Sequence, residues 1–142
     1  MKHVTQQNNF IYFTVALLLL LLASAFVDSV PESQGMMLVE LFILITHIVA
    51  YVSLNFGRYW RYFVVSMFVI ISIANLLNRF TDWSAGPLIA LTFTLIFYVG
   101  VALTAARKVL FPDEVNANIV VGALAIYMLL GLIWATLYLI II

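Results

Sequence analysis

Cysteine is missing from this 142-residue chain, and histidine, proline and charged residues are scarce. Without cysteine the chain can form no disulfide, no thiolate metal site and no cysteine nucleophile. Only two histidines remain for metal or acid–base chemistry, and no His-rich motif, carboxylate cluster or Ser–His pair accompanies them. We therefore expect neither an enzyme nor a bound cofactor or metal.

Charge is the second shortage, because Asp, Glu, Lys and Arg make up 8% of the residues while 66% are hydrophobic. So few charged side chains cannot cover the surface of a water-soluble protein. The formal net charge is zero, so no overall field would attract a nucleic acid. The composition predicts an integral membrane protein whose main partner is the lipid bilayer.

Five apolar runs are present, each close to the roughly 20 residues that a helix needs to cross a hydrocarbon core of about 30 Å. They cover about 10–27, 36–54, 62–77, 86–106 and 119–142. The joints are too short to fold alone, so residues 1–142 are predicted to form one all-α, polytopic domain with five transmembrane helices. Residues 23–25 resemble a signal-peptide cleavage site, but the mostly polar residues before the first run favour a retained span.

Positively charged residues predict the orientation, because Lys and Arg resist translocation. With the N-terminus in the cytoplasm, five of the six Lys and Arg residues lie on the cytoplasmic side and Arg79 alone lies outside. We therefore expect a cytoplasmic N-terminus. A short multi-span chain without cysteine or long loops suits the bacterial inner membrane. The five cytoplasmic charges are Lys2, Arg58, Arg61, Arg107 and Lys108.

Aromatic and cationic residues at the borders of the runs predict interfacial anchors. One group surrounds residues 58–61, and its alternative use is a binding site for a lipid headgroup or a protein partner. The predicted anchors are Arg58, Trp60, Arg61, Trp83, Arg107 and Lys108.

Helix starts and stops are also readable at two joints. Asp82 and Ser84 are expected to cap the helix that contains Pro87 in its first turn. Pro112 disfavours helix at the preceding residue and predicts that the fourth helix ends there. Asn116 or Asn118 is expected to cap the fifth helix.

Two ionisable residues, Glu40 and His47, lie within the second run. Such groups are costly in hydrocarbon and often carry function. Seven residues are nearly two helical turns, so both project from almost the same face at about 10 Å separation. One interpretation is a proton or cation path that includes Asn75 of the third run. The other is structural: Glu40 reaches water near the outer boundary, and a neutral His47 bonds a neighbouring helix.

Small residues in the last run predict a helix-packing face formed by Gly122, Gly131 and Ala135. The last two have the small-xxx-small spacing that allows close helix approach. Trp134 lies well inside the run, where its indole N–H needs an acceptor. We expect this helix to pack against protein, in a homo-oligomer or an assembly with related subunits, although a generic packing face is the simpler interpretation.

The segment that follows Arg107 contains the elbow FPDEVN at 111–116, a Gly-Ala pair at 122–123 and the sequence YMLLGLIWA at 127–135. This segment resembles the elbow and outer pore helix of bacterial potassium-channel-like membrane proteins. In that family several plain spans precede a two-helix ion-channel domain, and the four earlier runs match only in number and hydrophobicity. The resemblance implies ion transport, with a monovalent cation as the transported species.

That family continues with a pore helix, a Thr-x-Gly-Tyr-Gly filter whose carbonyls replace the water around potassium, and an inner helix. Neither Gly-Tyr-Gly nor Gly-Phe-Gly occurs here, so no filter residue is assigned and these residues alone are not expected to conduct potassium selectively. The last apolar run reaches Ile142 without a polar border, which predicts that further residues follow. Two functions stay open: the pre-pore part of a channel-like protein, or a proton-coupled transporter or accessory subunit that uses Glu40 and His47.

Overall fold

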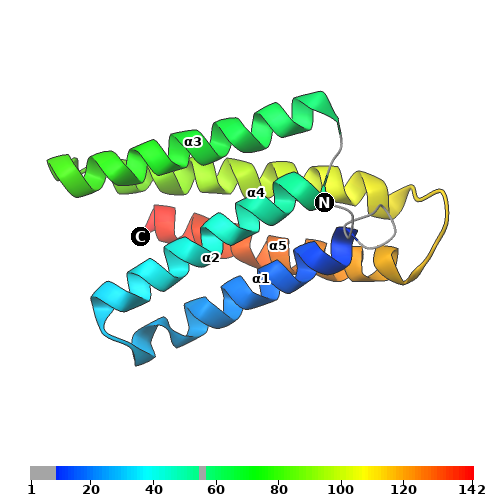
Figure 1. The fold of residues 1–142 in the computed structure, drawn as a ribbon, viewed down its shortest axis with the longest axis horizontal. Helices are drawn as coiled ribbons and strands as arrows, with labels where there is room; N and C mark the ends of the chain where they lie inside the picture. Colours follow the sequence, from blue (N-terminus) through cyan, green and yellow to red (C-terminus); the bar gives the residue numbers. More distant parts are fainter. Residues whose placement is uncertain (1–8, 55–56) are drawn as a thin grey trace.

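Five long helices make up the computed structural model, which describes residues 9–54 and 57–142 (Figure 1). Each helix is long and apolar enough to cross a membrane, and the described residues form no strand. The prediction of an all-helical chain with five helices of membrane-spanning length is therefore confirmed. The helices are α1 (Asn9–Phe26), α2 (Glu32–Ser53), α3 (Arg58–Thr81), α4 (Gly86–Leu110) and α5 (Ala117–Ile141), with a short 3-10 turn at Val27–Ser29.

The third helix extends beyond its apolar run at both ends. It starts at Arg58 and ends at Thr81, whereas the run covers about 62–77. Gly57 precedes it with φ 116°, a conformation that glycine adopts easily, and Asp82 ends it in the left-handed region with φ 48°. The ends of α3 are set by the backbone conformation of Gly57 and Asp82, so the helix includes the polar residues that bordered the apolar run. Its 24 residues span about 36 Å, longer than the hydrocarbon core.

The start of α4 differs from the expected capping. Pro87 lies in the first turn, as predicted, but the N-cap is Ala85 and no side chain caps the helix. The prediction that Asp82 and Ser84 cap this helix is wrong. The tight joint is closed instead by the backbone, because the Gly86 N–H donates to the carbonyl of Trp83 at 3.0 Å.

The joint between α4 and α5 follows the sequence prediction. Helix α4 ends at Leu110, and the Phe111 N–H donates to the Arg107 carbonyl at 3.2 Å. Asn116 caps α5, since its side-chain oxygen accepts from the Ile119 N–H at 3.1 Å. Of the two asparagines proposed as the cap, Asn116 has this role.

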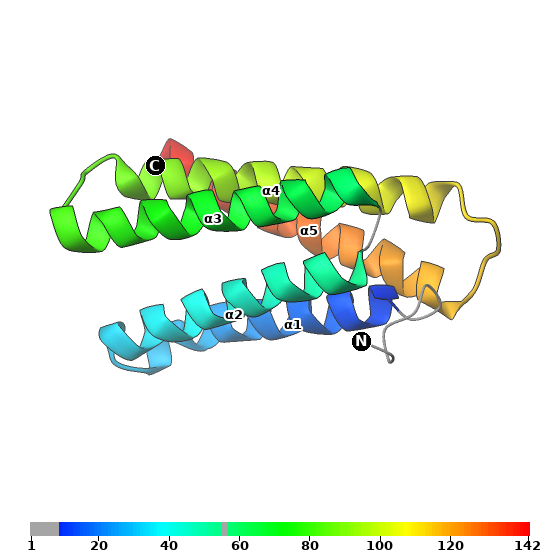
Figure 2. The same cartoon turned by 45° about the horizontal axis from the view of Figure 1, so that its top comes forward.

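Two antiparallel pairs, α1 with α2 and α3 with α4, are joined by α5, which packs against both α4 and α1 (Figures 1 and 2). The contact between α2 and α3 is much smaller than the contacts within the two pairs or those that α5 makes with α4 and α1. One end of the bundle carries the α1–α2 and α3–α4 joints and the end of α5. The opposite end carries the starts of α1, α3 and α5.

Side chains from all five helices form one core. Gly122 lets α5 approach closely, because an added Cβ would lie 2.9 Å from Val109 and 3.0 Å from Phe10. Gly100 does the same on α4, where an added Cβ would lie 2.5 Å from Phe63. The largest fully buried side chains include Phe10, Phe13, Leu17, Leu54, Val64, Phe97, Val101 and Leu129.

Candidate functional site

Glu40 forms an ion pair with Arg79, which comes from the end of α3. Both side chains are partly exposed, 41% for Glu40 and 55% for Arg79. The two residues lie 39 positions apart, and the antiparallel course of α2 and α3 brings them together. The carboxylate therefore has a structural partner near the end of the bundle.

His47 is buried at 3% exposure and lies among aromatic rings. Its ring stacks on Phe97 of α4, with centroids 4.0 Å apart and 16° between the planes, and tilts against Phe68 of α3. Nδ1 lies 2.8 Å from the Ile43 carbonyl, so this nitrogen carries a hydrogen and donates it. In the part of the chain that the structure describes, Nε2 is buried and has no hydrogen-bond partner.

The three residues proposed for a cation path are not joined by hydrogen bonds. Glu40 is paired with Arg79, while His47 bonds its own helix. Asn75 is partly buried on α3, and within residues 9–54 and 57–142 its side chain forms no hydrogen bond. The same residues contain no group of three His, Asp or Glu side chains placed to hold a metal ion.

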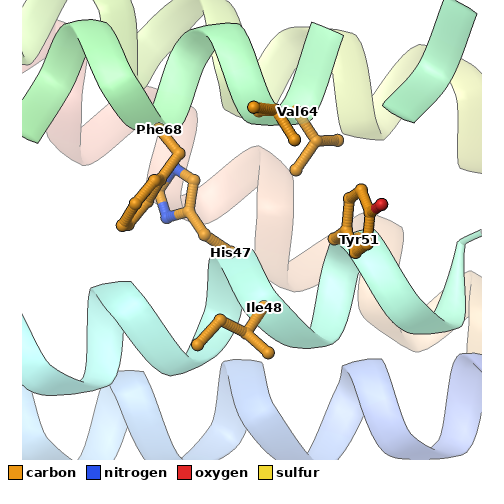
Figure 3. A pocket seen from close by; sticks show the side chains of 6 residues that line it. His47, Ile48, Tyr51, Val64 and Phe68 are labelled. Atoms are coloured by element: carbon orange, nitrogen blue, oxygen red, sulfur yellow. The ribbon is translucent and has the colours of Figure 1, made fainter. Parts of the chain in front are cut away.

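A small cleft lies beside His47, between α2 and α3 (Figure 3). Its volume is about 150 Å³, and its accessible wall is apolar. Ile48, Tyr51 and Val65 are exposed at its rim, so the cleft opens on the outer surface of the bundle. Its lining residues are His47, Ile48, Tyr51, Val64, Val65 and Phe68.

Helix α5 has two distinct faces. Gly122 lies on the inner face, buried against Phe10 and Val109. Gly131 and Ala135 lie on the outer face, and an added Cβ at Gly131 would meet no atom within 4 Å. The predicted packing face is therefore divided between the inside of the bundle and its surface. We use the name α5 stripe for the exposed residues Tyr127, Gly131, Trp134, Ala135 and Tyr138.

Two buried asparagines join the starts of α1 and α5. The Asn118 amide donates to Asn9 Oδ1 at 2.8 Å, and its own oxygen accepts from the Phe10 N–H at 3.0 Å. The Thr14 hydroxyl donates to the Val121 carbonyl at 3.3 Å, one turn further along both helices. No sequence signal indicated this contact, because the asparagines lie 109 residues apart and each also suits a helix cap.

The predicted anchors occupy different surroundings. Arg58, Arg61, Arg107 and Lys108 are exposed near one end of the bundle, and Trp83 is 41% exposed near the other. Trp60 instead points inward, at 7% exposure, and tilts against Phe63 in the core. The arginines of the 58–61 segment thus face outward while its tryptophan fixes α3 to the bundle.

Comparisons with protein-family models, curated proteins and solved structures find no match to this chain. The similarity of residues 107–135 to the potassium-channel family therefore stays a sequence-based prediction.

Proposed function

We propose that this chain is a membrane-embedded module of an ion-transporting assembly of the bacterial potassium-channel type. In this proposal the N-terminus is cytoplasmic, the membrane is a bacterial inner membrane, and the α5 stripe contacts further helices of the assembly. The α5 stripe is the observation that carries the proposal. A second support is the resemblance of residues 107–135 to an outer pore helix.

The spacing of the α5 stripe places its members on one helical face. Tyr127, Gly131, Trp134 and Tyr138 follow each other at intervals of four, three and four residues, each close to one helical turn. Tyr127 and Trp134 are 74% and 72% exposed. Small residues beside large ones form a slot that a neighbouring helix can enter.

The polar tips of these aromatics argue for protein rather than lipid as the neighbour. Tyr127 and Trp134 lie about 3 Å and 8 Å along the axis from the middle of α5, well inside a core of about 30 Å. Lipid tails accept no hydrogen bond, and an unpaired hydroxyl or indole N–H in hydrocarbon is unfavourable. Facing helices can supply acceptors for both groups.

Cross-linking through an introduced cysteine is specific here because residues 1–142 contain no cysteine of their own. We expect Ala135→Cys, alkylated with a maleimide that carries a photoreactive benzophenone, to form cross-linked adducts in native membranes on irradiation. The matched control is Leu76→Cys on α3, which is 55% exposed but lies outside the α5 stripe. Mass spectrometry of the adduct should identify a chain that carries a potassium-type filter, and the reconstituted adduct should pass potassium ions.

Two results would count against the proposal. Equal cross-linking at positions 76 and 135 would show that the α5 stripe has no specific neighbour. If no chain in the adduct contains a filter and the adduct passes no potassium, the chain belongs to an assembly that is not a potassium channel.

A proton-coupled transporter or accessory subunit that uses Glu40 and His47 is the alternative. It gains less support from the geometry, because each residue is bonded to a different group and the described side chains form no hydrogen-bonded link between them. Under this alternative, Glu40→Gln abolishes proton-coupled transport while the assembly stays intact. Under the channel proposal, the same variant leaves cross-linking at position 135 and ion flux in place.

A further inference from the structure

The cleft between α2 and α3 has the size and chemistry of a site for part of a lipid chain. A cavity of about 150 Å³ can hold benzene, so this cleft can hold about six carbon atoms. Its accessible wall is apolar, and its exposed rim includes Tyr51 and Val65. Tyr51 of α2 faces Val64 of α3 across the cleft (Figure 3). A molecule can therefore enter sideways from the bilayer.

Two arginines lie on the same face of α3 as the cleft. Arg58, Arg61, Val65 and Phe68 are spaced three, four and three residues apart, which places them in one stripe along the helix. The last two line the cleft. Arg61 precedes Val65 by four residues, or about 6 Å of rise, and helical side chains lean toward the N-terminus. We therefore expect its guanidinium at or beyond the end of the cleft nearest the start of α3.

Both arginines are available to an anion. They are exposed, and among the described residues neither forms an ion pair. They also occupy the first turn of α3, where the helix dipole disfavours positive charge and favours an anion. The helix start has no side-chain cap, so its backbone N–H groups add to the attraction for a phosphate.

The distance between charge and cleft fits a phospholipid. The headgroup zone occupies about 5–7 Å on each side of the hydrocarbon core, which is comparable with the rise from Arg61 to Val65. We propose that Arg58 and Arg61 bind the phosphate of an anionic phospholipid whose acyl chain lies in the cleft between α2 and α3. A free phosphate uses only the arginines, whereas this site joins them to an apolar cleft open to the bilayer.

The test measures lipid binding to the full chain by native mass spectrometry. Phosphatidylglycerol and phosphatidylcholine with the same acyl chains are the probes, and sn-glycerol 3-phosphate is the headgroup-like probe without chains. We expect phosphatidylglycerol to bind most tightly and sn-glycerol 3-phosphate not to compete. Replacing both arginines, Arg58→Gln with Arg61→Gln, should weaken phosphatidylglycerol about thirtyfold, at about tenfold per 1.4 kcal/mol and about 1 kcal/mol for each charge.

A charge-matched control separates this site from general attraction. The double variant Arg107→Gln with Lys108→Gln removes the same charge from exposed positions near the same end of the bundle, and it should keep binding within about threefold. Val65→Trp should fill the cleft and weaken both lipids. Circular dichroism would establish that every variant keeps its helical content.

Three results would overturn the proposal. Equal loss in the two charge variants would mean general electrostatic attraction. Effective competition by sn-glycerol 3-phosphate would mean a phosphate site without a chain site. Unchanged lipid binding in a folded Val65→Trp variant would mean that the acyl chain does not occupy the cleft.

Discussion

At the residue scale, the contact between Asn9 and Asn118 meets a need of the backbone. The first N–H groups of a helix have no acceptor within that helix. The Phe10 N–H donates both to Asn9 Oδ1, at 2.9 Å, and to Asn118 Oδ1, and Asn118 also donates to Asn9, so the Asn118 side chain fixes the start of α1 against α5. Because both asparagines are buried, water cannot easily replace a lost partner.

We expect Asn118→Ala to lower the free energy of unfolding by about 1–3 kcal/mol, since two buried hydrogen bonds are lost, one to Asn9 Oδ1 and one from the Phe10 N–H, while the bond from the Phe10 N–H to Asn9 Oδ1 stays. Asn116→Ala is the control, because it removes an exposed helix cap and should cost about 1 kcal/mol. Unfolding in mixed micelles, followed by circular dichroism, measures both. A smaller cost at position 118 than at 116 would contradict the role of the buried contact.

The ion pair of Glu40 and Arg79 should contribute modestly, because both side chains are partly exposed. We expect a coupling energy of about 0.2–1 kcal/mol in a double-mutant cycle of Glu40→Gln and Arg79→Gln. The same unfolding assay measures the four proteins of the cycle. A coupling energy near zero would mean that the pair does not stabilise the contact between α2 and α3.

At the scale of the element, the two glycines of α5 lie on opposite faces of the helix, so their variants test packing inside the bundle and contact at its surface separately. Gly131→Ala should stabilise the isolated chain by about 0.5–1 kcal/mol, because alanine favours helix and the added methyl meets no atom. Gly122→Ala should destabilise it by about 1–3 kcal/mol, since Phe10 and Val109 must move.

The Gly131→Ala variant also tests whether a neighbouring helix contacts the α5 stripe. Gly131→Ala should also weaken cross-linking through Ala135→Cys, because a close helix approach is lost. A Gly131→Ala variant that is more stable and still cross-links fully would argue that no helix enters the slot at Gly131.

The existence of the helices was predictable, but several of their ends and contacts were not. Each helix corresponds to an apolar run of membrane-spanning length, Pro112 predicted the end of α4, and Asn116 was one of the two predicted caps of α5. The start of α4 was misjudged because a backbone bond to Trp83 closes that turn without a capping side chain. Local sequence preferences cannot distinguish a helix start that is capped by a side chain from one that is closed by a backbone hydrogen bond.

The candidate sites were predictable only in part. Glu40 and His47 were identifiable as polar residues in an apolar run, but their partners depend on how helices pack. Arg79 reaches Glu40 from 39 residues away, and His47 stacks on Phe97 of α4. The cleft beside His47 could not be predicted from the sequence either, because it arises where α2 and α3 pack loosely.

At the scale of the whole molecule, the bundle separates its charges between two ends. Arg58, Arg61, Arg107 and Lys108 lie near one end. Near the other end, Arg79 is the one basic residue within the described part of the chain, and Glu40 is its partner. Four of these five Lys and Arg residues thus lie at one end, a distribution that favours a cytoplasmic location for that arginine-rich end.

This orientation predicts which joints are accessible from outside an intact cell. We expect Ser84→Cys, between α3 and α4, to react with a membrane-impermeant maleimide in intact cells with a permeable outer envelope. Asp113→Cys, between α4 and α5, should react only after the inner membrane is opened. Both positions are exposed, so a difference in labelling reports the side of the membrane rather than burial. The reverse pattern would place the arginine-rich end outside, and it would remove the cytoplasmic N-terminus from the proposed function while leaving the five-helix fold unchanged.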